Sequence, residues 1–246
     1  MPVEFIADLH IHTCLSPCAE LSMTPKGIVE KAASLGINII AVCDHNSAEN
    51  VEVTKDLAKK KGISVIAGME ISSSEEVHVL GFFKDTESVL KMQAVVYENL
   101  QAGENDEDKF GMQVVVNEDN EVLGFNKRLL IGATSLSVNK VVDLIHGFNG
   151  IAAASHIDRD VFGIIGHLGF IHPDIKFDAL EISYRLKFKE ALIKYGAYSH
   201  IPWVSSSDAH RIEDIGRRTT RFFMSHSTFE EFSLALKGAE GRKVSF

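Results

Sequence analysis

Three polar side chains alternate near the start of the chain, where Asp8, His10 and His12 follow the apolar run 3–7. Residues two apart in an extended segment point to the same face, so we expect these side chains to project together. Polar groups at the end of a buried strand cost free energy unless something binds them. Two imidazoles and a carboxylate suit a divalent metal, whereas the alternative is an edge strand with a hydrated polar face.

Further ligand-type residues recur where an expected strand gives way to a loop. They are Asp44 with His45, Glu70, His156, Asp208 with His210, and His78 on a short strand just after Glu70. In a parallel α/β barrel the carboxyl ends of the strands share one face, and that face carries the active site. We therefore expect these residues to converge in space although they are far apart in the sequence.

Strands and helices are expected to alternate around these residues. Apolar runs predict strands over 3–7, 37–43, 63–69, 77–81, 151–155, 177–182, 202–206 and 220–224. Helical spacing predicts helices over 24–35, 48–61, 86–101, 138–148, 188–195 and 228–237. Segments 113–116 and 122–125 flank a short polar loop, which predicts a hairpin inserted at about 104–130. The repeated units favour a parallel α/β architecture, expected as one domain over 1–246.

Composition restricts the classes of function. The chain has 246 residues, of which 45% are hydrophobic, and this allows one large core. A net charge of -9 argues against a broad phosphate-binding surface but permits a small anionic substrate held by metals and a few arginines. Three cysteines without framework spacing, no recognisable signal peptide and no run of membrane-spanning length predict a cytoplasmic location.

The number of potential ligands exceeds what one metal needs. A single catalytic zinc takes three protein ligands plus water, whereas the strand ends offer six imidazoles and several carboxylates. We therefore expect two or three divalent metals, with a carboxylate bridging between them. Clustered cations polarise a phosphoryl oxygen and lower the pKa of bound water. This predicts hydrolysis of a phosphate ester by a metal-bound hydroxide, with no separate catalytic side chain.

Taken together, the motifs resemble those of the PHP (polymerase and histidinol phosphatase) family. They are Asp8-x-His10-x-His12, Cys43-Asp44-His45, Gly68-x-Glu70, His78, His156 and Ser207-Asp208-Ala209-His210. The resemblance implies a distorted (β/α)7 TIM-like barrel, a trinuclear site for zinc, manganese or iron, and phosphoesterase activity in a free-standing enzyme. It also implies three sets of ligands, with Glu70 bridging the first two: His10, His12 and Asp208; His78 and His156; His45 and His210.

The remaining ligand of the third metal is expected from the loop after His12, where this chain departs from the family's spacing. Counting forward from His12 favours Cys18, and counting back from the helix start at Thr24 favours Glu20. We expect Glu20 because a carboxylate suits the harder metals, and Cys18 is the alternative.

Other polar residues are expected to support the metal ligands or the substrate. Asp8 and Asp44 are expected to orient histidine ligands. Arg159 is the first candidate for a phosphate clamp because a planar guanidinium matches phosphate oxygens, and Arg185 and Arg217 are weaker candidates.

The expected substrate is a small phosphomonoester, a nucleotide or a short oligonucleotide, without membrane binding and without long duplex nucleic acid. A barrel scaffold does not fix the leaving group, so a metal-assisted hydrolase acting on another bond is an alternative. A non-catalytic, metal-binding regulatory domain is a second alternative. The full set of ligands favours an enzyme.

Overall fold

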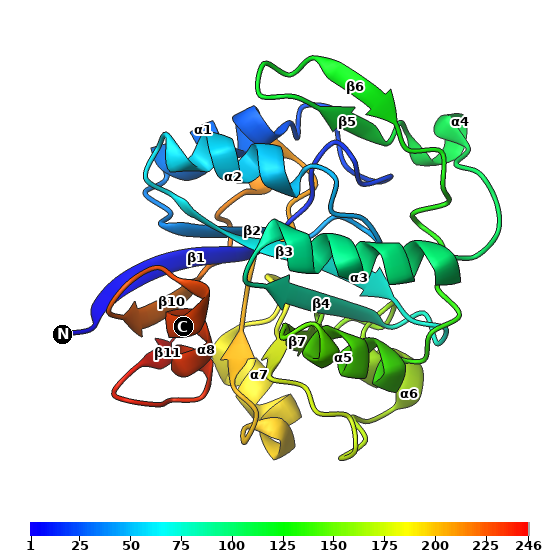
Figure 1. Ribbon diagram of the computed structural model, residues 1–246. Coiled ribbons are helices and arrows are strands. Elements are labelled where there is room, and N and C mark those ends of the chain that lie inside the picture. Colours follow the sequence, from blue (N-terminus) through cyan, green and yellow to red (C-terminus); the bar gives the residue numbers. More distant parts are fainter. Residues whose placement is uncertain (246) are drawn as a thin grey trace.

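One large sheet forms the centre of the molecule (Figure 1). The structure is a computed structural model, and it describes residues 1–245. The nine strands of the sheet are β1 (Val3–Ile11), β2 (Ile39–Val42), β3 (Ser64–Ser72), β4 (His78–Phe83), β7 (Ile151–Ala154), β8 (Ala179–Glu181), β9 (Trp203–Val204), β10 (Thr220–Met224) and β11 (Lys243–Ser245). Their order across the sheet is β11-β10-β1-β2-β3-β4-β7-β8-β9. The expected hairpin is a separate two-stranded sheet of β5 (Val114–Val116) and β6 (Val122–Phe125).

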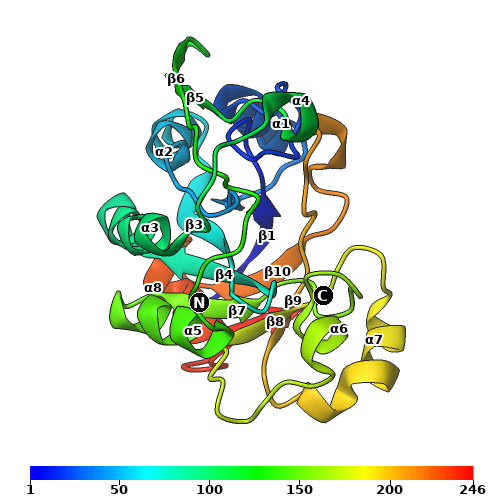
Figure 2. The same ribbon diagram turned by 90° about the vertical axis from the view of Figure 1, so that its right-hand side faces the viewer.

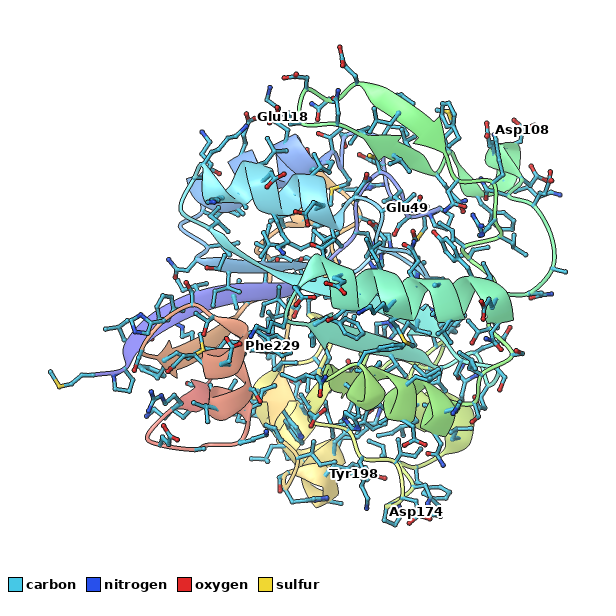
Figure 3. All side chains as sticks on the ribbon, in the orientation of Figure 1. Glu49, Asp108, Glu118, Asp174, Tyr198 and Phe229 are labelled. Carbon is cyan, nitrogen blue, oxygen red and sulfur yellow. The ribbon has the colours of Figure 1, made fainter. Side chains whose placement is uncertain are left out.

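Helices pack on the outside of the large sheet, as the two views show, except that the short α4 (Glu107–Phe110) lies apart from it (Figures 1 and 2). The other helices are α1 (Pro25–Ser34), α2 (Val51–Lys59), α3 (Thr86–Asn99), α5 (Val138–Gly147), α6 (Ile164–Leu168), α7 (Phe188–Tyr195) and α8 (Phe229–Leu236), with 3-10 turns η1 (Gly196–Tyr198) and η2 (Ile212–Asp214). The side chain of Asp108, on α4, points outwards (Figure 3). Thr24 starts α1 because its side chain accepts a hydrogen bond from the Gly27 N–H, and Pro25 occupies the first turn. None of the helices within residues 1–245 is long and apolar enough to span a membrane.

Most predicted elements form close to their expected bounds, and α7 has those bounds unchanged. The sequence pattern predicts none of α4, α6 and β11. These elements have four, five and three residues. Segments this short contain too little periodicity to be recognised from the sequence.

Strand β4 runs antiparallel to both of its neighbours, β3 and β7. The pairs β1–β2, β2–β3, β7–β8 and β8–β9 are parallel, as expected. Because β4 is reversed, its first residue, His78, pairs with Ser72 at the end of β3. The start of β4 therefore reaches the same edge as the carboxyl ends of the parallel strands.

The segment after β9 returns to β1 and nearly closes the sheet into a barrel. The N–H of His12 donates to the carbonyl of Ala209 at 3.0 Å, and the N–H of Ala209 donates to the carbonyl of His10 at 3.3 Å. The predicted TIM-like barrel is confirmed, with β4 antiparallel to both of its neighbours and β10 antiparallel to β1 and β11. Leu9, Leu80 and other inward side chains are fully buried in its interior.

Aromatic residues close the opposite end of the barrel from the polar strand ends. Phe232 on α8 packs edge-to-face against Phe82 and Phe222, with ring centroids 5.7 and 5.2 Å apart. Each buried phenylalanine of this kind stabilises the fold by about 1.5–3 kcal/mol through the burial of its apolar area. The polar ligand-type residues therefore lie on a rigid apolar base.

Candidate metal centre

The eight motif residues that were expected to bind metal lie together in one cluster at the ends of the strands. They are His10, His12, His45, Glu70, His78, His156, Asp208 and His210. All of them are buried except His210, which is partly exposed. Ligand atoms fall within 4.8 Å of one another in three groups: His10, His12 and Asp208; His12, His45 and His210; and His45, Glu70 and His78.

Glu70 lies at the centre of this cluster and inside β3, since that strand continues past the expected end to Ser72. Its Oε1 is 3.0 Å from His78 Nδ1, 3.3 Å from His156 Nε2 and 3.4 Å from His10 Nε2. Its Oε2 is 3.1 Å from His45 Nδ1 and 3.5 Å from His12 Nε2. The two oxygens thus face different sets of imidazoles, which is the arrangement that a bridging carboxylate needs.

Gly68 allows β3 to approach β2 closely enough for this position of Glu70. A Cβ atom at residue 68 would lie 2.5 Å from Cys43 Sγ and 2.7 Å from the carbonyl oxygen of Val42. Neither contact is tolerable for a side chain, because Val42 ends the packed adjacent strand and the fully buried Cys43 follows it directly. The glycine in the Gly68-x-Glu70 motif is therefore required by backbone packing.

Three atoms of the cluster, Glu70 Oε1, His78 Nδ1 and His156 Nδ1, are buried without a hydrogen-bond partner among the described residues. Glu70 Oε1 and His78 Nδ1 lie 3.0 Å apart, but neither atom makes a hydrogen bond. His10 Nε2 and His12 Nε2 also face each other, at 3.1 Å. Lone pairs that converge in a buried place are stabilised by a cation, so this donor set fits divalent metals.

The protonation states of several groups also fit metal binding. Burial would raise the pKa of the Glu70 carboxyl, but the charges of His78, His10 and His45 hold it well below its usual range. Burial lowers the pKa of His78 to about 4. Burial, together with the charges of His210 and His45, also lowers the pKa of His12 well below its usual value. Ionised carboxylates and neutral imidazoles are the forms that bind metals, which fits Glu70, His78 and His12. Burial would lower the pKa values of His10 and His45, but the charges of Glu181 beside His10 and of Cys18 beside His45 raise both well above the usual value.

Asp208 connects the cluster to the predicted phosphate clamp. Its Oδ1 lies 3.4 Å from His12 Nε2 and 3.6 Å from His10 Nε2, while its Oδ2 accepts a hydrogen bond from Arg159 Nη1 at 2.7 Å. The backbone φ angles are 50° at Asp208 and 25° at His156. Non-glycine residues rarely adopt such angles, and strain of this kind is found where a fold fixes functional side chains.

Glu181 contacts two ligand-type histidines, and the sequence motifs did not identify it as a site residue. Its Oε2 lies 3.0 Å from His10 Nδ1 and accepts a hydrogen bond from the backbone N–H of His156 at 3.0 Å. A carboxylate on one ring nitrogen directs the other nitrogen towards a metal. The available signal was the carboxylate of Glu181 close to the carboxyl end of the expected strand 177–182, which also contains Asp178 near its start.

Asp44 acts on a histidine indirectly. It accepts hydrogen bonds from the Thr13 N–H at 2.6 Å and from Ser16 Oγ at 2.7 Å, and Ser16 Oγ lies 2.9 Å from His12 Nδ1. Asp44 therefore fixes the His12 ring through Ser16. The expected function of orienting a histidine is consistent with this chain of contacts.

Asp8 has a different position from the expected one. Its carboxylate accepts hydrogen bonds from the backbone N–H groups of Ser207 and Gly216, both at 2.9 Å. It thus anchors the loop that carries Asp208, and no contact between Asp8 and an imidazole is formed among the described residues. Burial raises the pKa of Asp8 to about 6, although these hydrogen bonds oppose the shift.

The loop after β1 contains both candidates for the remaining ligand, Cys18 and Glu20, and both side chains are exposed. Glu20 is exposed and its carboxylate pairs with Arg211 Nε at 3.0 Å. Desolvation raises the pKa of the Cys18 thiol, but the charge of His45 and hydrogen bonds with His210 and His45 outweigh it and lower the pKa to about 6. Neither residue belongs to the three groups described above, but of the two only Cys18 interacts with histidines of the cluster.

The two weaker arginine candidates differ in their surroundings. Arg217 donates to the carbonyls of Ser207 and Asp208, and its guanidinium lies 3.3 Å from the centroid of the Tyr184 ring. These contacts hold the Asp208 loop in place. Arg185 is exposed and its Nε donates to Tyr184 Oη at 3.2 Å, so its terminal nitrogens remain accessible.

Comparisons with known proteins agree with the fold and the motifs. The family described as PHP domain matches residues 8–201, and the PHP-associated family matches residues 194–240. A 5'-3' exoribonuclease of Haemophilus influenzae is 34% identical over 77 residues, which are 30% of this chain and 27% of that protein. This chain thus matches about a quarter of that curated relative's length.

Two solved structures share the fold at lower identity. The lesion-specific endonuclease Q of Pyrococcus furiosus has a TM-score of 0.76 and 20% identity, covering 98% of this chain and 58% of that one. A protein of Bifidobacterium adolescentis assigned as a metal-dependent phosphoesterase has a TM-score of 0.57 and 18% identity, covering 85% and 89%. Because the family match extends over most of the sequence, the chain belongs to the PHP domain family.

Proposed function

We propose that this protein hydrolyses phosphate esters with two or three divalent metals, zinc, manganese or iron, bound at the cluster. The position of Glu70 is the observation that carries the proposal, since its two oxygens face separate sets of imidazoles. The PHP family and the names of the similar proteins, an exoribonuclease, an endonuclease and a phosphoesterase, support this reaction class.

The proposed ligands follow the three sets expected from the motifs. Glu70 would bridge two sites, one with His10, His12 and Asp208, and one with His78 and His156. The third site would use His45 and His210, with Cys18 in place of the expected Glu20. When bound, the metals would polarise a phosphoryl oxygen and lower the pKa of water. Glu181 would fix the orientation of His10, and Asp44 would fix that of His12 through Ser16.

Arg159 is proposed to hold the phosphate group next to the cluster. One terminal nitrogen donates to Asp208 Oδ2, which leaves further N–H groups of the fork for phosphate oxygens. The ion pair fixes the guanidinium beside Asp208, and the side chain is only 30% exposed. A guanidinium positioned in advance loses little conformational entropy when an anion binds.

The experiment is a metal analysis combined with an activity screen. Protein purified without chelator should contain more than one equivalent of metal, and manganese-, iron- or zinc-loaded samples should hydrolyse members of a nucleotide and sugar-phosphate panel. At most one equivalent after reloading would contradict the multinuclear site. Full metal content without hydrolysis of any phosphate ester would favour a non-catalytic metal-binding domain or a hydrolase acting on another bond.

We further propose a preference for short substrates. The net charge of -9 weakens binding to long polyanions, because such binding depends on many cationic contacts. Fluorescence anisotropy near physiological salt should show weak binding of a long DNA duplex. Tight binding of that duplex would contradict this preference.

A further inference from the structure

The hairpin of β5 and β6 leaves one strand edge free at the periphery of the molecule, where both views place β6 outermost (Figures 1 and 2). Among residues 1–245, β6 pairs with β5 on one side and with no strand on the other. We propose that β6 pairs antiparallel with β6 of a second copy of this chain, so that the two hairpins form one continuous sheet across a twofold axis. This inference goes beyond the proposed hydrolysis and does not depend on it.

The opposite edge of the hairpin is fixed to the rest of the chain. The N–H of Val114 donates to the carbonyl of Cys14 at 2.9 Å. The N–H of Val116 donates to Asn50 Oδ1 at 3.2 Å, and the side chains of both valines are buried against Cys14. The hairpin is therefore ordered before a partner arrives. A strand that is ordered in advance loses little conformational entropy when it pairs.

The outward backbone groups of β6 are available for pairing. Val114 lies opposite Phe125, and because the Val114 N–H is directed away from β6 to Cys14, these two residues form a non-hydrogen-bonded pair. The N–H and C=O groups of Phe125 therefore face the free edge. Leu123 has no partner on β5, because the register of the hairpin skips it. Both residues can thus form ladder hydrogen bonds with another strand.

The free edge lacks the features that usually prevent pairing between chains. Segment 122–126 contains neither a proline nor a charged residue. Its large apolar side chains face solvent, with Val122, Leu123 and Phe125 exposed by 54%, 67% and 45%. Edge strands of natural proteins are commonly protected by lysine, by proline or by a covering element. Pairing would remove this apolar surface from water, which favours association.

The charges at the two ends of β6 make the strand complementary to itself. Glu121 lies two residues before Leu123, and Lys127 lies two residues after Phe125. When Leu123 pairs antiparallel with the partner's Phe125, Glu121 therefore lies opposite the partner's Lys127. Twofold symmetry repeats each contact, so that opposite charges flank the apolar pairs at both ends. This complementarity selects a second copy of the chain as the partner.

Both charged side chains are accessible to a partner. Glu121 is exposed and accepts a hydrogen bond from Asn117 Nδ2 at 2.7 Å, and no basic residue among residues 1–245 pairs with it. Lys127 pairs with Glu107, but the lysine side chain is 61% exposed and its ammonium has three donors. Exposed ion pairs of this kind contribute little to stability, so a second carboxylate can join or replace Glu107.

Sedimentation velocity of the complete chain tests the pairing, at physiological salt that screens the net charge of -9. Wild type should show a reversible monomer–dimer equilibrium, because an interface between two short strands is small. Leu123→Lys places a charge on the free edge and should raise the dissociation constant of the dimer about tenfold, through the loss of both apolar pairs. The matched control is Leu90→Lys on α3, an exposed leucine outside the hairpin, which should leave the dimer unchanged.

Charge reversal tests the register. Glu121→Lys and Lys127→Glu each place like charges opposite one another at both ends, so each variant alone should dimerise about tenfold more weakly. An equimolar mixture of these two variants should form a mixed dimer as tight as that of wild type, because opposite charges face each other again. Recovery in the mixture would also show that both variants are folded. Asp119→Lys, in the exposed turn of the hairpin, is the control for net charge and should have no effect.

Three outcomes would overturn the interface. Wild type that stays monomeric up to about 1 mM would exclude the pairing and leave the edge of β6 for an extended segment of another protein. A dimer that is equally stable in Leu123→Lys would place the contact on another surface. A mixture of the two charge-reversal variants that dimerises no better than either variant alone would refute the antiparallel register.

Discussion

His10 Nδ1 lies 3.0 Å from Oε2 of Glu181, which ends β8 and lies 171 positions further along the sequence. Since a carboxylate only accepts hydrogen bonds, this contact places a proton on Nδ1 and leaves Nε2 directed towards Glu70 and Asp208. Glu181 also accepts the His156 N–H. One side chain therefore positions groups from two sides of the cluster.

Glu181→Gln should weaken metal binding without unfolding the protein. Loss of a carboxylate partner of a ligating histidine typically costs about 10–100-fold in metal affinity. Competition titration with a chelator measures this loss, and the exposed Glu190→Gln on α7 is the matched control. Unchanged metal affinity of Glu181→Gln would show that Glu181 does not orient a ligand.

Glu70→Gln should abolish most activity, because the substitution removes a negative charge that faces five imidazoles. We expect at least about a 100-fold loss of turnover together with reduced metal content. Circular dichroism should show a retained fold, since Glu70 lies above the apolar interior. Near-normal turnover with full metal content would refute the bridging assignment.

Cys18→Ser and Glu20→Gln should differ in their effect on the third metal. The charge and hydrogen bonding of His45 and His210 lower the pKa of the Cys18 thiol to about 6 although burial opposes this shift, while Glu20 pairs with Arg211. Cys18→Ser is therefore expected to lose about one metal equivalent and Glu20→Gln to retain it, since a thiolate is a strong zinc ligand. In cobalt-loaded protein, Cys18→Ser should also remove a thiolate-to-metal charge-transfer band. The reverse pattern would identify Glu20 as the ligand.

Phe162 should determine the orientation of the His78 ring. The two rings stack with centroids 4.4 Å apart and an interplanar angle of 7°, and the Phe162 carbonyl accepts the His78 N–H at 3.0 Å. Phe162→Ala is expected to weaken metal binding about tenfold, whereas Phe162→Tyr should preserve it because the ring remains. Equal metal affinity of Phe162→Ala and wild type, measured by chelator competition, would refute this.

The pH dependence of stability should contain a contribution from Glu231. Hydrogen bonds from Arg242 and from the Ser225 N–H lower the pKa of Glu231 from 4.5 to about 2. A carboxyl group whose pKa is lower in the folded state than in the unfolded state stabilises the fold at pH values above its unfolded-state pKa. This stabilisation is lost as the pH falls through the folded-state pKa. Glu231→Gln should therefore lower Tm at pH 7, and its difference from wild type should shrink between pH 4.5 and 2. A difference that is constant over this range would contradict the assignment.

Local sequence patterns determined the fold class and the set of residues in the cluster. The alternation of Asp8, His10 and His12 follows from the two-residue period of a strand, and apolar runs of strand length alternate with helical stripes. These periods are properties of neighbouring residues, so they can be read without knowing the packing. The motifs at strand ends then identified eight side chains that the barrel does bring together.

Only the tertiary structure decided how distant residues meet. Glu181 contacts His10 across 171 positions, and Asp8 contacts Ser207 across 199, distances at which sequence spacing carries no geometric information. The reversal of β4, which brings His78 to the strand ends, depends on sheet pairing. Cys18 and Glu20 lie two residues apart in one loop, and the path of that loop directs the thiol to His45 and His210 while Glu20 pairs with Arg211. Local propensities do not determine such a path, because long-range packing and ion pairing select it.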